Sequence, residues 1–284
     1  MTIAIEPLHP LFGAEIKGVD IAAGLDAATF AVIRGAFEEH SVLLFRGQKV
    51  DDAIQIAFSE RFGPLEKTVA ANPARGTVFA RQSNIDMATG ALIPKDDRRM
   101  KYQAGNYLWH SDSSFKQVPS LCSILSTREV PPEGGNTEFA STRAAYDLLP
   151  DELKAELEGL VVEHSLVYSR SLTGFEMTEQ EKAELPTARQ ILVRTNPVNG
   201  RKGLMIGAHA ARIVDWPEEK GRALLDELLA LTTRPEACYS HAWRDGDLIV
   251  WDNRCCLHRA TPYDSTRYRR LMQRTTVAGD GPAV

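Results

Sequence analysis

The sequence predicts a mainly β fold, either a β-sandwich or a jelly roll, with a few helices at its periphery. Short runs typical of strands recur at residues 121–126, 137–140, 190–195, 204–206, 237–243, 247–251 and 268–277. Helical patterns lie between some of them. No repeat or linker divides the chain, so we expect one domain, 1–284, with a mostly helical and irregular insertion at roughly 141–188.

In the part of the chain before these strands, the sequence predicts a strand with one helix before it and one helix after it. Residues 26–40 and 51–62 carry apolar side chains at helical spacing. Residues 41–45 form a short apolar run typical of a strand, and Gly63 is a helix stop. We therefore expect a helix, a strand and a second helix in this order.

Three further helices are expected later in the chain. Residues 151–160 place leucines on one face. Thr178 and Glu181 have the spacing of a capping box, in which each side chain bonds to the backbone of the other residue. Residues 217–231 begin with a proline suited to a first helical turn.

The composition excludes several classes of partner. The 33 Lys and Arg against 38 Asp and Glu leave a net charge of −5, without the basic excess that nucleic acids require. No apolar run approaches the roughly 20 residues of a membrane span, and the N-terminus lacks a signal-peptide pattern. We expect a soluble cytoplasmic protein with no nucleic-acid or membrane partner, whose cysteines are reduced, buried thiols.

Two separate motifs supply three side chains that can ligate a metal. His110 and Asp112 are two residues apart, so on an extended segment they face one side. His258 follows an apolar strand 146 positions after Asp112 (258 − 112). Two histidines and one carboxylate are the facial arrangement that holds Fe(II) with positions left open. From spacing alone, a surface hydrogen-bonded pair and a satisfied core histidine remain the alternative.

A cationic segment near the C-terminus predicts binding of small anions. Arg270 and Arg274 are four residues apart, so on a strand both face one side. If that side is the interior, each guanidinium needs an anion to offset its desolvation, and two carboxylates can be bound separately. The alternative is a solvated charge run, which we expect for Arg267 and Arg269 on the other face.

Short motifs along almost the whole chain carry a family resemblance. They are 8–12 (LHPLF), 41–48 (SVLLFRGQ), 55–58 (QIAF), 62–66 (FGPLE), 108–115 (LWHSDSSF), 134–139 (GGNTEF), 143–147 (RAAYD), 207–210 (GAHA) and 251–258 (WDNRCCLH). With them the sequence resembles the taurine dioxygenase/TfdA family of Fe(II)- and 2-oxoglutarate-dependent dioxygenases. It looks closest to the 2,4-dichlorophenoxyacetate (aryloxyalkanoate) dioxygenase branch. The resemblance implies a double-stranded β-helix, the jelly-roll core of cupin type.

The resemblance also implies the ligands of the metal and of the cosubstrate. Fe(II) is expected on His110, Asp112 and His258. The distal carboxylate of 2-oxoglutarate is expected on Thr137 and Arg270, with its keto acid end on the iron. O2 is the second cosubstrate, and ascorbate is expected to support the reaction in vitro.

Three more residues are implied in binding a small anionic substrate. Arg274 matches the family arginine that binds the acid group, and His209 matches a histidine of the aryloxyacetate branch. Asn106 matches a pocket asparagine that could contact either substrate. A structural role for His209 stays open, and so does a homo-oligomer.

The implied reaction converts 2-oxoglutarate to succinate and CO2 while a C–H bond of the substrate is hydroxylated. An aryloxyacetate hydroxylated next to its ether oxygen would collapse to a phenol and glyoxylate. Asn136 and Arg212 depart from the pattern of the branch, where aspartate and histidine are found, and this leaves the substrate open. The alternatives are taurine or another alkylsulfonate, a zinc-dependent hydrolase, and a non-catalytic acid-binding barrel.

Overall fold

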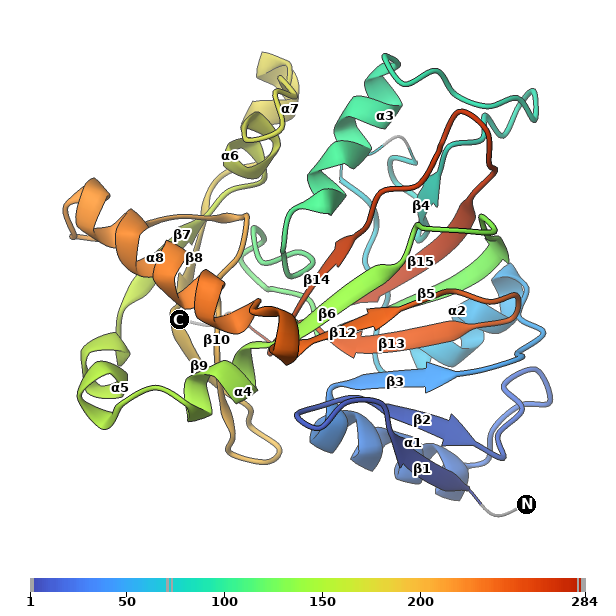
Figure 1. Ribbon diagram of the computed structural model, residues 1–284, viewed down its shortest axis with the longest axis horizontal. Helices are drawn as coiled ribbons and strands as arrows, with labels where there is room; N and C mark the ends of the chain where they lie inside the picture. The colour runs from blue at the N-terminus through green and yellow to red at the C-terminus, as the bar shows by residue number, and fades with distance from the viewer. Residues whose placement is uncertain (1–2, 70–71, 73, 280, 282–284) are drawn as a thin grey trace.

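A long sheet built on the apolar strands of the sequence forms one layer of the fold (Figure 1). The computed structural model describes residues 3–69, 72, 74–279 and 281. The strand order is β1-β2-β3-β13-β5-β15-β4, and only the β2–β3 pair is parallel. The bounds are β1 (Ala4–Pro7), β2 (Ala14–Lys17), β3 (Val42–Phe45), β4 (Ala80–Ser83), β5 (Cys122–Glu129), β13 (Leu248–Asp252) and β15 (Leu271–Val277).

A smaller antiparallel sheet packs against the long one. Its order is β12-β6-β14, with β12 (Cys238–His241), β6 (Thr137–Ser141) and β14 (Cys256–Ala260). Phe139 and Cys256 from the small sheet join Leu125, Trp251 and Met272 from the long sheet in one buried apolar cluster. Side chains from two facing sheets therefore form the core between them, which confirms the predicted jelly-roll class.

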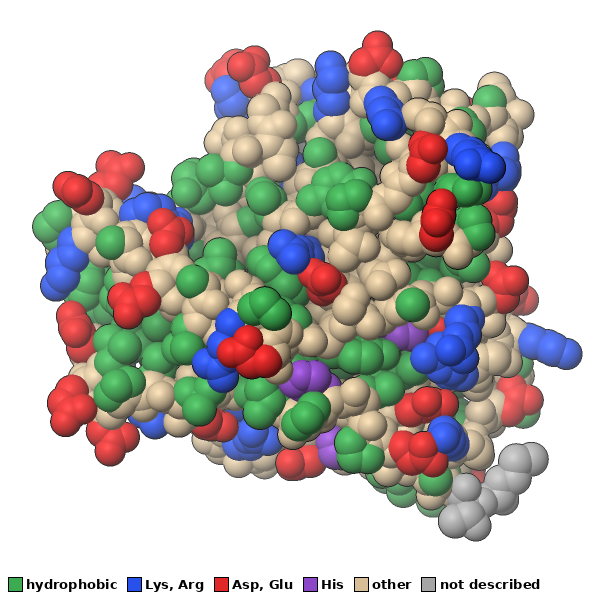
Figure 2. Space-filling view, viewed as in Figure 1, with side chains coloured by type: hydrophobic (Ala, Val, Ile, Leu, Met, Phe, Trp, Pro, Cys, Tyr) green, Lys and Arg blue, Asp and Glu red, His purple; other side chains and the backbone are tan. Residues whose placement is uncertain are grey.

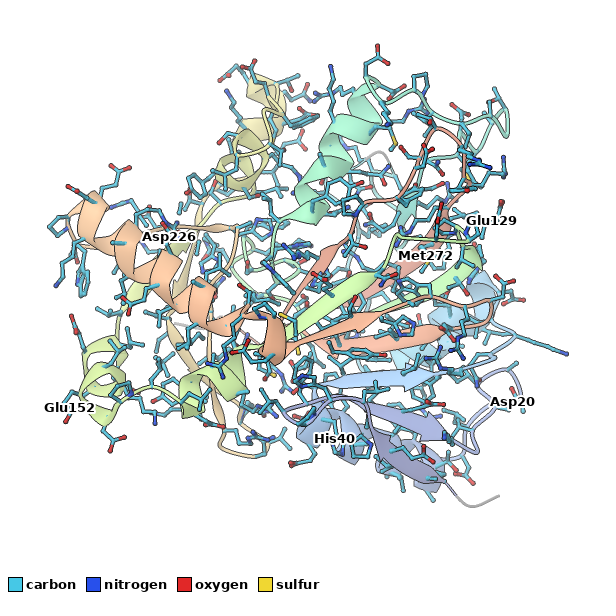
Figure 3. The ribbon with its side chains drawn as sticks, viewed as in Figure 1. Asp20, His40, Glu129, Glu152, Asp226 and Met272 are labelled. Atoms are coloured by element: carbon cyan, nitrogen blue, oxygen red, sulfur yellow. The ribbon has the colours of Figure 1, made fainter. Side chains whose placement is uncertain are left out.

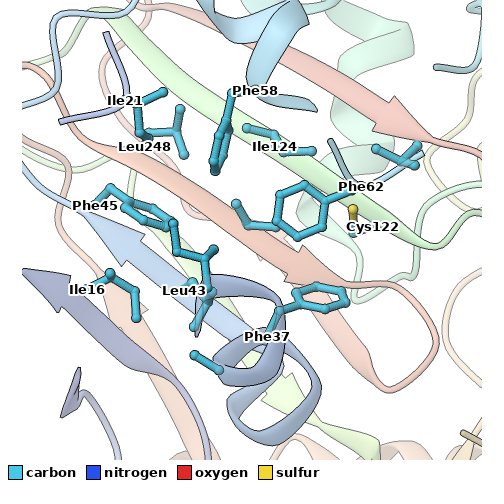
Figure 4. Close-up of a cluster of buried hydrophobic side chains, with 14 of the residues drawn as sticks. Ile16, Ile21, Phe37, Leu43, Phe45, Phe58, Phe62, Cys122, Ile124 and Leu248 are labelled. Carbon is cyan, nitrogen blue, oxygen red and sulfur yellow. The ribbon is translucent and has the colours of Figure 1, made fainter. Parts of the chain in front are cut away.

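Two helices cover the other face of the long sheet, where residues 26–40 and 51–62 predicted them. They are α1 (Ala27–His40) and α2 (Asp52–Glu60). Phe37 and Phe58 from these helices, with Phe62, pack against Leu43 and Ile124 of the sheet (Figure 4). Burial of these large apolar side chains stabilises the layer by about 2 kcal/mol each.

The chain between β6 and β12, residues 142–237, forms a lobe beside the two sheets, on the left in Figure 1. It contains a sheet of order β11-β7-β8 and the pair β10-β9. The predicted insertion at roughly 141–188 covers about the first half of this segment and also includes Ser141, the last residue of β6; β7 is a strand inside it. The elements are α4 (Thr142–Asp147), α5 (Asp151–Leu157), β7 (Val161–His164), α6 (Leu166–Ser171), α7 (Glu179–Ala183), β8 (Ala188–Ile191), β9 (Val193–Thr195), β10 (Lys202–Leu204), β11 (Ala210–Ile213), α8 (Glu218–Thr232) and the 3-10 helix η2 (Pro235–Ala237).

Local sequence signals predicted some element boundaries correctly and others incorrectly. The capping box is present, with Glu181 N–H donating to Thr178 Oγ1 and Thr178 N–H donating to Glu181 Oε2. Pro217 lies just before α8 rather than in its first turn. The single strand expected at 190–195 is wrong: Leu192 N–H bonds to Leu160 O, so β8 and β9 pair with different strands.

One helical segment that the sequence did not predict lies next to the site. α3 (Arg98–Gln103) continues into the 3-10 helix η1 (Ala104–Tyr107). Asp97 caps α3 by accepting from the N–H of Arg99. The helix is short and polar, so it lacks the long apolar period by which helices are recognised in a sequence.

The outer surface carries mixed charge. Acidic and basic side chains are interspersed over the face shown in Figure 2. Glu152 and Asp226 lie on the outer helices α5 and α8, whereas Met272 lies on the sheets (Figure 3). Among the described residues, none of the helices combines the length and apolar character that crossing a membrane needs.

Candidate active site

The small sheet brings the two histidines of the predicted metal site together. His110 and His258, on β14, form an antiparallel bridge in which each N–H donates to the other's carbonyl, at 3.1 and 2.9 Å. Their ring centroids are 4.2 Å apart. Asp112 faces both rings, with carboxylate oxygens 3.8 Å from His110 Nε2 and 3.7 Å from His258 Nε2. All three side chains are buried, and one ligand atom from each lies within 4.8 Å of the others.

The protonation of these groups fits a metal ion. His110 Nδ1 lies 2.7 Å from Leu108 O, and a carbonyl only accepts, so Nδ1 carries the hydrogen and Nε2 carries the lone pair. Burial lowers the pKa of His110 to about 4 and the pKa of His258 well below its usual value, so both rings are neutral near pH 7. Two neutral nitrogens and a carboxylate suit Fe(II), and the site contains no thiolate.

Asp112 is held in place as an anion. Burial by itself would raise the pKa of Asp112, but the charge of Arg274, then the His258 and His110 rings and the Ser123 hydroxyl, hold that pKa well below its usual range. Ser123 Oγ donates to Oδ2 and Arg274 Nη1 lies beside Oδ1, both at 2.7 Å. The carboxylate is therefore ionised and oriented toward the histidines.

A second pocket beside these residues is lined by both Arg270 and Thr137, the two residues expected to hold the cosubstrate. It encloses about 340 Å³, including the part open to solvent, and His110 and His258 also line it. Arg270 is buried; its guanidinium donates to carbonyl oxygens at 3.4 and 3.5 Å and lies 5.9 Å from the centroid of the Tyr263 ring, and no carboxylate of a described residue pairs with it. Thr137 Oγ1 accepts a hydrogen bond from Trp243 Nε1–H at 3.0 Å. The pocket therefore offers an uncommitted cation and a hydroxyl to an anion.

The larger pocket encloses about 560 Å³, including its open part, and is lined by Arg274 together with His110 and Asp112. Arg274 lines both pockets, and its ion pair with Asp112 places it beside the metal ligands. The apolar side chains that line the larger pocket include Val69, Val78, Phe115 and Leu166, beside the charged Glu66, Lys67 and Lys116. The pocket therefore combines a cation at the metal end with an apolar surface.

His209 and Asn106 both line this larger pocket. His209 Nδ1 lies 2.8 Å from Ser169 Oγ, and the ring lies 5.8 Å from that of His110. Burial lowers the pKa of His209 well below its usual value, so the ring is neutral. Asn106 also lines the smaller pocket and donates to Gln82 Oε1 at 2.6 Å. The fold thus brings all eight residues expected from the sequence to one region.

Several residues at the site were not predicted. Asn253 accepts a hydrogen bond from Asp112 N–H and donates one to Ser123 Oγ, so it connects the segment that contains Asp112 to β5. Its place inside the 251–258 motif was a signal that could have found it. Gln82 and Trp243 lie far from any site motif, and only the fold places them beside Asn106 and Thr137.

The chain is similar to known enzymes over its full length. It is 43% identical over 283 residues to an "Alpha-ketoglutarate-dependent 2,4-dichlorophenoxyacetate dioxygenase" of Cupriavidus pinatubonensis (strain JMP 134), covering 98% of both chains. It is 38% identical over 285 residues to an "(S)-phenoxypropionate/alpha-ketoglutarate-dioxygenase" of Sphingobium herbicidovorans, covering 97% of this chain and 95% of that one.

A solved structure gives the same result. The crystal structure of AAD-2 in complex with Mn(II) and N-oxalylglycine matches with a TM-score of 0.92 and 43% identity, covering 100% of this chain and 99% of that one. The profile of the family described as "Taurine catabolism dioxygenase TauD, TfdA family" matches residues 4–276. The resemblance predicted from the sequence motifs is thereby confirmed, and the chain belongs to the TauD/TfdA family of dioxygenases.

Proposed function

We propose that this protein is an Fe(II)- and 2-oxoglutarate-dependent dioxygenase that hydroxylates a small aryloxyalkanoate. The hydroxylated substrate then collapses to a phenol and glyoxylate. In the overall reaction, 2-oxoglutarate and O2 become succinate and CO2, and the second oxygen atom enters the substrate. The observation that carries the proposal is the convergence of His110, Asp112 and His258 between two pockets that each contain an arginine.

The three ligands would hold the iron, which supplies the redox chemistry that activates O2 when it is bound. Leu108 O and Ser123 Oγ orient His110 and Asp112 through the hydrogen bonds described above. Such partners of metal ligands fix the tautomer of a histidine and the direction of a carboxylate. All three side chains are buried, so the ligand atoms themselves would be largely withdrawn from bulk water.

The smaller pocket fits 2-oxoglutarate. Arg270 can bind its distal carboxylate with a bidentate guanidinium, and no carboxylate of a described residue competes for that arginine. Trp243 donates to Thr137 Oγ1, so the hydroxyl hydrogen of Thr137 remains free to donate to the same anion. Asn106 lines both this site and the larger pocket, and its partner Gln82 lines this site.

The larger pocket fits the prime substrate. Arg274 would bind its acid group next to the metal ligands and thus determine which carbon faces the iron. Phe115 and Leu166 offer apolar contacts for an aryl ring, and His209 is a neutral partner at the pocket wall. The names of the two enzymes that are 43% and 38% identical support an aryloxyalkanoate over other acids. An alkylsulfonate is the second candidate, because a guanidinium binds either acid type.

The test is a panel of aryloxyacetates, both enantiomers of aryloxypropionates, alkyl carboxylates and alkylsulfonates. Succinate release is measured with Fe(II), 2-oxoglutarate and ascorbate under air, and the phenol is measured separately. We expect succinate and phenol in equal amounts with aryloxy acids. Succinate formation only with sulfonates would move the substrate to the second candidate.

Two other outcomes would reject the reaction class. A zinc-dependent hydrolase would act without O2 and without 2-oxoglutarate. A non-catalytic acid-binding barrel would bind the acids without metal and would turn over none of them. Assays with Zn(II) under nitrogen and binding measurements in a chelator distinguish these cases from the proposed enzyme.

A further inference from the structure

Buried arginines in this protein fall into two groups. Four arginines among the described residues are buried, namely Arg143, Arg170, Arg254 and Arg270. Arg143 and Arg254 reach the carboxylate of Asp252, at 4.0 and 2.8 Å. Within the described part of the chain, no carboxylate forms an ion pair with the other two. Arg270 has its function in the proposed cosubstrate site, which leaves Arg170 unexplained.

Arg170, on α6, is 6% exposed and lies against α3 and η1. Its guanidinium carbon is 4.7 Å from the centroid of the Tyr102 ring. A Cβ at Gly105 would lie 1.9 Å from Arg170 Nη1, so a larger residue at 105 would exclude the guanidinium. The backbone of Gly105 has no positive φ, which means that the glycine is needed here for space. The chain therefore forms a close-fitting seat for this side chain.

The residues around Arg170 offset the desolvation of its guanidinium only in part. The Tyr102 ring offsets some of the desolvation of the guanidinium, but Nε is buried without a hydrogen-bond partner. Nε is therefore a donor of Arg170 that no described residue accepts from. A buried guanidinium with an uncommitted N–H donor is suited to a planar anion such as a carboxylate.

Arg170 lines the larger pocket, the one proposed for the prime substrate, together with Arg274 and His209. Arg274 already donates to Asp112 at 2.7 Å, so part of its donor capacity is in use at the metal ligands. Arg170 approaches from the lobe formed by 142–237, whereas Arg274 belongs to the long sheet. The two cations thus reach one pocket from different parts of the fold.

We propose that Arg170 is a second anchor for the acid group of the prime substrate. The carboxylate is bound by donors from both Arg170 and Arg274, and Tyr102 and Gly105 hold Arg170 in the required place. This inference rests on the proposed function and specifies how its substrate acid is recognised. It also makes α6 part of the recognition surface, so the lobe contributes to the choice between acids and uncharged analogues.

The test compares Arg170→Gln and Arg170→Lys with the unsubstituted enzyme. Binding is measured by anaerobic calorimetry on enzyme loaded with Fe(II) and 2-oxoglutarate. The probes are the best acid of the panel and its uncharged amide. We expect Arg170→Gln to weaken acid binding about 10- to 100-fold, because a charged hydrogen bond is lost. Amide binding and 2-oxoglutarate binding should be unchanged, and Arg170→Lys should be intermediate because it keeps the charge without the planar fork.

A structural role is tested by a matched control in the same cluster. Arg98 lies 4.5 Å from the Phe175 ring centroid and pairs with Glu181 at 2.6 Å, but it is outside the pocket. Arg98→Gln should leave acid binding unchanged, whereas Gly105→Ala should reproduce the loss by displacing the guanidinium of Arg170. Thermal unfolding of each variant checks that the fold is kept.

Two results would overturn the inference. One is wild-type acid affinity in Arg170→Gln. The other is an equal loss of acid and amide binding, which would show that Arg170 acts only through packing. Absence of turnover with every acid would instead reject the proposed function, and this inference with it, and that result is read on the unsubstituted enzyme before any variant is compared.

Discussion

Burial determines the charge state of the residues at the site. It lowers the pKa of His110 to about 4, which keeps the ring neutral and its Nε2 lone pair available to a metal. The same burial would raise the pKa of Asp112, but the charge of Arg274 more than offsets it and keeps the carboxylate ionised. Each residue type at the site therefore has the protonation that metal binding needs.

Removing the carboxylate ligand should abolish activity. We expect Asp112→Ala to lower Fe(II)-dependent succinate formation more than about 100-fold, because two histidines alone hold the metal poorly. Iron content after purification and succinate release are the measurements. Asp20→Ala, at the surface, is the control. Normal turnover in Asp112→Ala would remove Asp112 from the metal ligands.

The two arginines of the C-terminal segment should differ in which substrate they bind. Arg270→Gln should raise the KM for 2-oxoglutarate at least about 10-fold, with a smaller effect on the acid substrate. Arg274→Gln should do the reverse. Steady-state kinetics with each substrate varied in turn measure both constants. If both variants raise the two KM values equally, the arginines share one site.

At the scale of single residues, much of the candidate site could be predicted from the sequence. The spacing of His110, Asp112 and His258 indicated a metal site, and the family resemblance assigned the cosubstrate and substrate residues. The supporting partners could not be predicted, because a hydrogen bond such as that of Trp243 to Thr137 joins residues that are distant in the chain and lie in no common pattern.

At the scale of elements, α2 is attached to the long sheet by a buried amide. Gln55 is fully buried, and its Nε2 donates to the carbonyls of Ile124 on β5 and Gln273 on β15. Its Oε1 accepts from Ser126 Oγ. One side chain therefore satisfies backbone groups on two neighbouring strands, in addition to the apolar contacts of the helix.

Replacing this amide should cost more stability than a surface change. Gln55→Leu should lower the free energy of unfolding by about 2–4 kcal/mol, because two carbonyls and a hydroxyl lose a buried donor or acceptor. Urea unfolding followed by circular dichroism measures the change. Gln180→Leu, on the exposed α7, should stay within about 0.5 kcal/mol. Equal effects of the two substitutions would contradict this attachment.

Elements with strong local signals were predicted from the sequence, and short ones were not. Asp26 and Thr178 cap their helices, and the apolar runs of β3 and β13 are central strands. β4 and β7 contain consecutive charged or polar residues, at 81–83 and 163–164, and so they lack the apolar run by which a short strand is recognised. Their pairing with β15 and β8 is a property of the sheet, since the partner strand completes their hydrogen bonds.

At the scale of the whole molecule, a buried histidine links the lobe to the loop that carries the metal ligands. His164, on β7, is fully buried; its Nδ1 lies 3.1 Å from Ser114 Oγ and its Nε2 lies 3.2 Å from Met205 O. Burial lowers its pKa from the ordinary 6.5 to about 4. Between these values the unfolded chain binds a proton that the folded protein does not.

Stability should therefore fall in mild acid. The contribution of His164 is complete above about pH 6.5, decreases as the pH falls, and levels off near pH 4, after a loss of about 3 kcal/mol. Urea unfolding of metal-free protein at a series of pH values measures this dependence. His164→Gln, which does not titrate, should make the curve shallower over that interval, and the remaining slope belongs to the other buried histidines, His110, His209 and His258. Parallel curves for the two proteins would exclude His164 as the cause.

Donor atoms and hydrophobic spacing can be recognised in a linear chain, and so the sequence alone was sufficient for the jelly-roll class and the family, and for selecting His110, Asp112 and His258 as candidate metal ligands. The free or paired state of a buried charge depends on residues that meet only after folding. Asp252 neutralises Arg143 and Asp112 pairs with Arg274, while Arg170 lies in the larger pocket without a carboxylate among the described residues. The proposed second anchor could therefore be inferred only from the tertiary structure, because burial without a partner is a relation between distant residues.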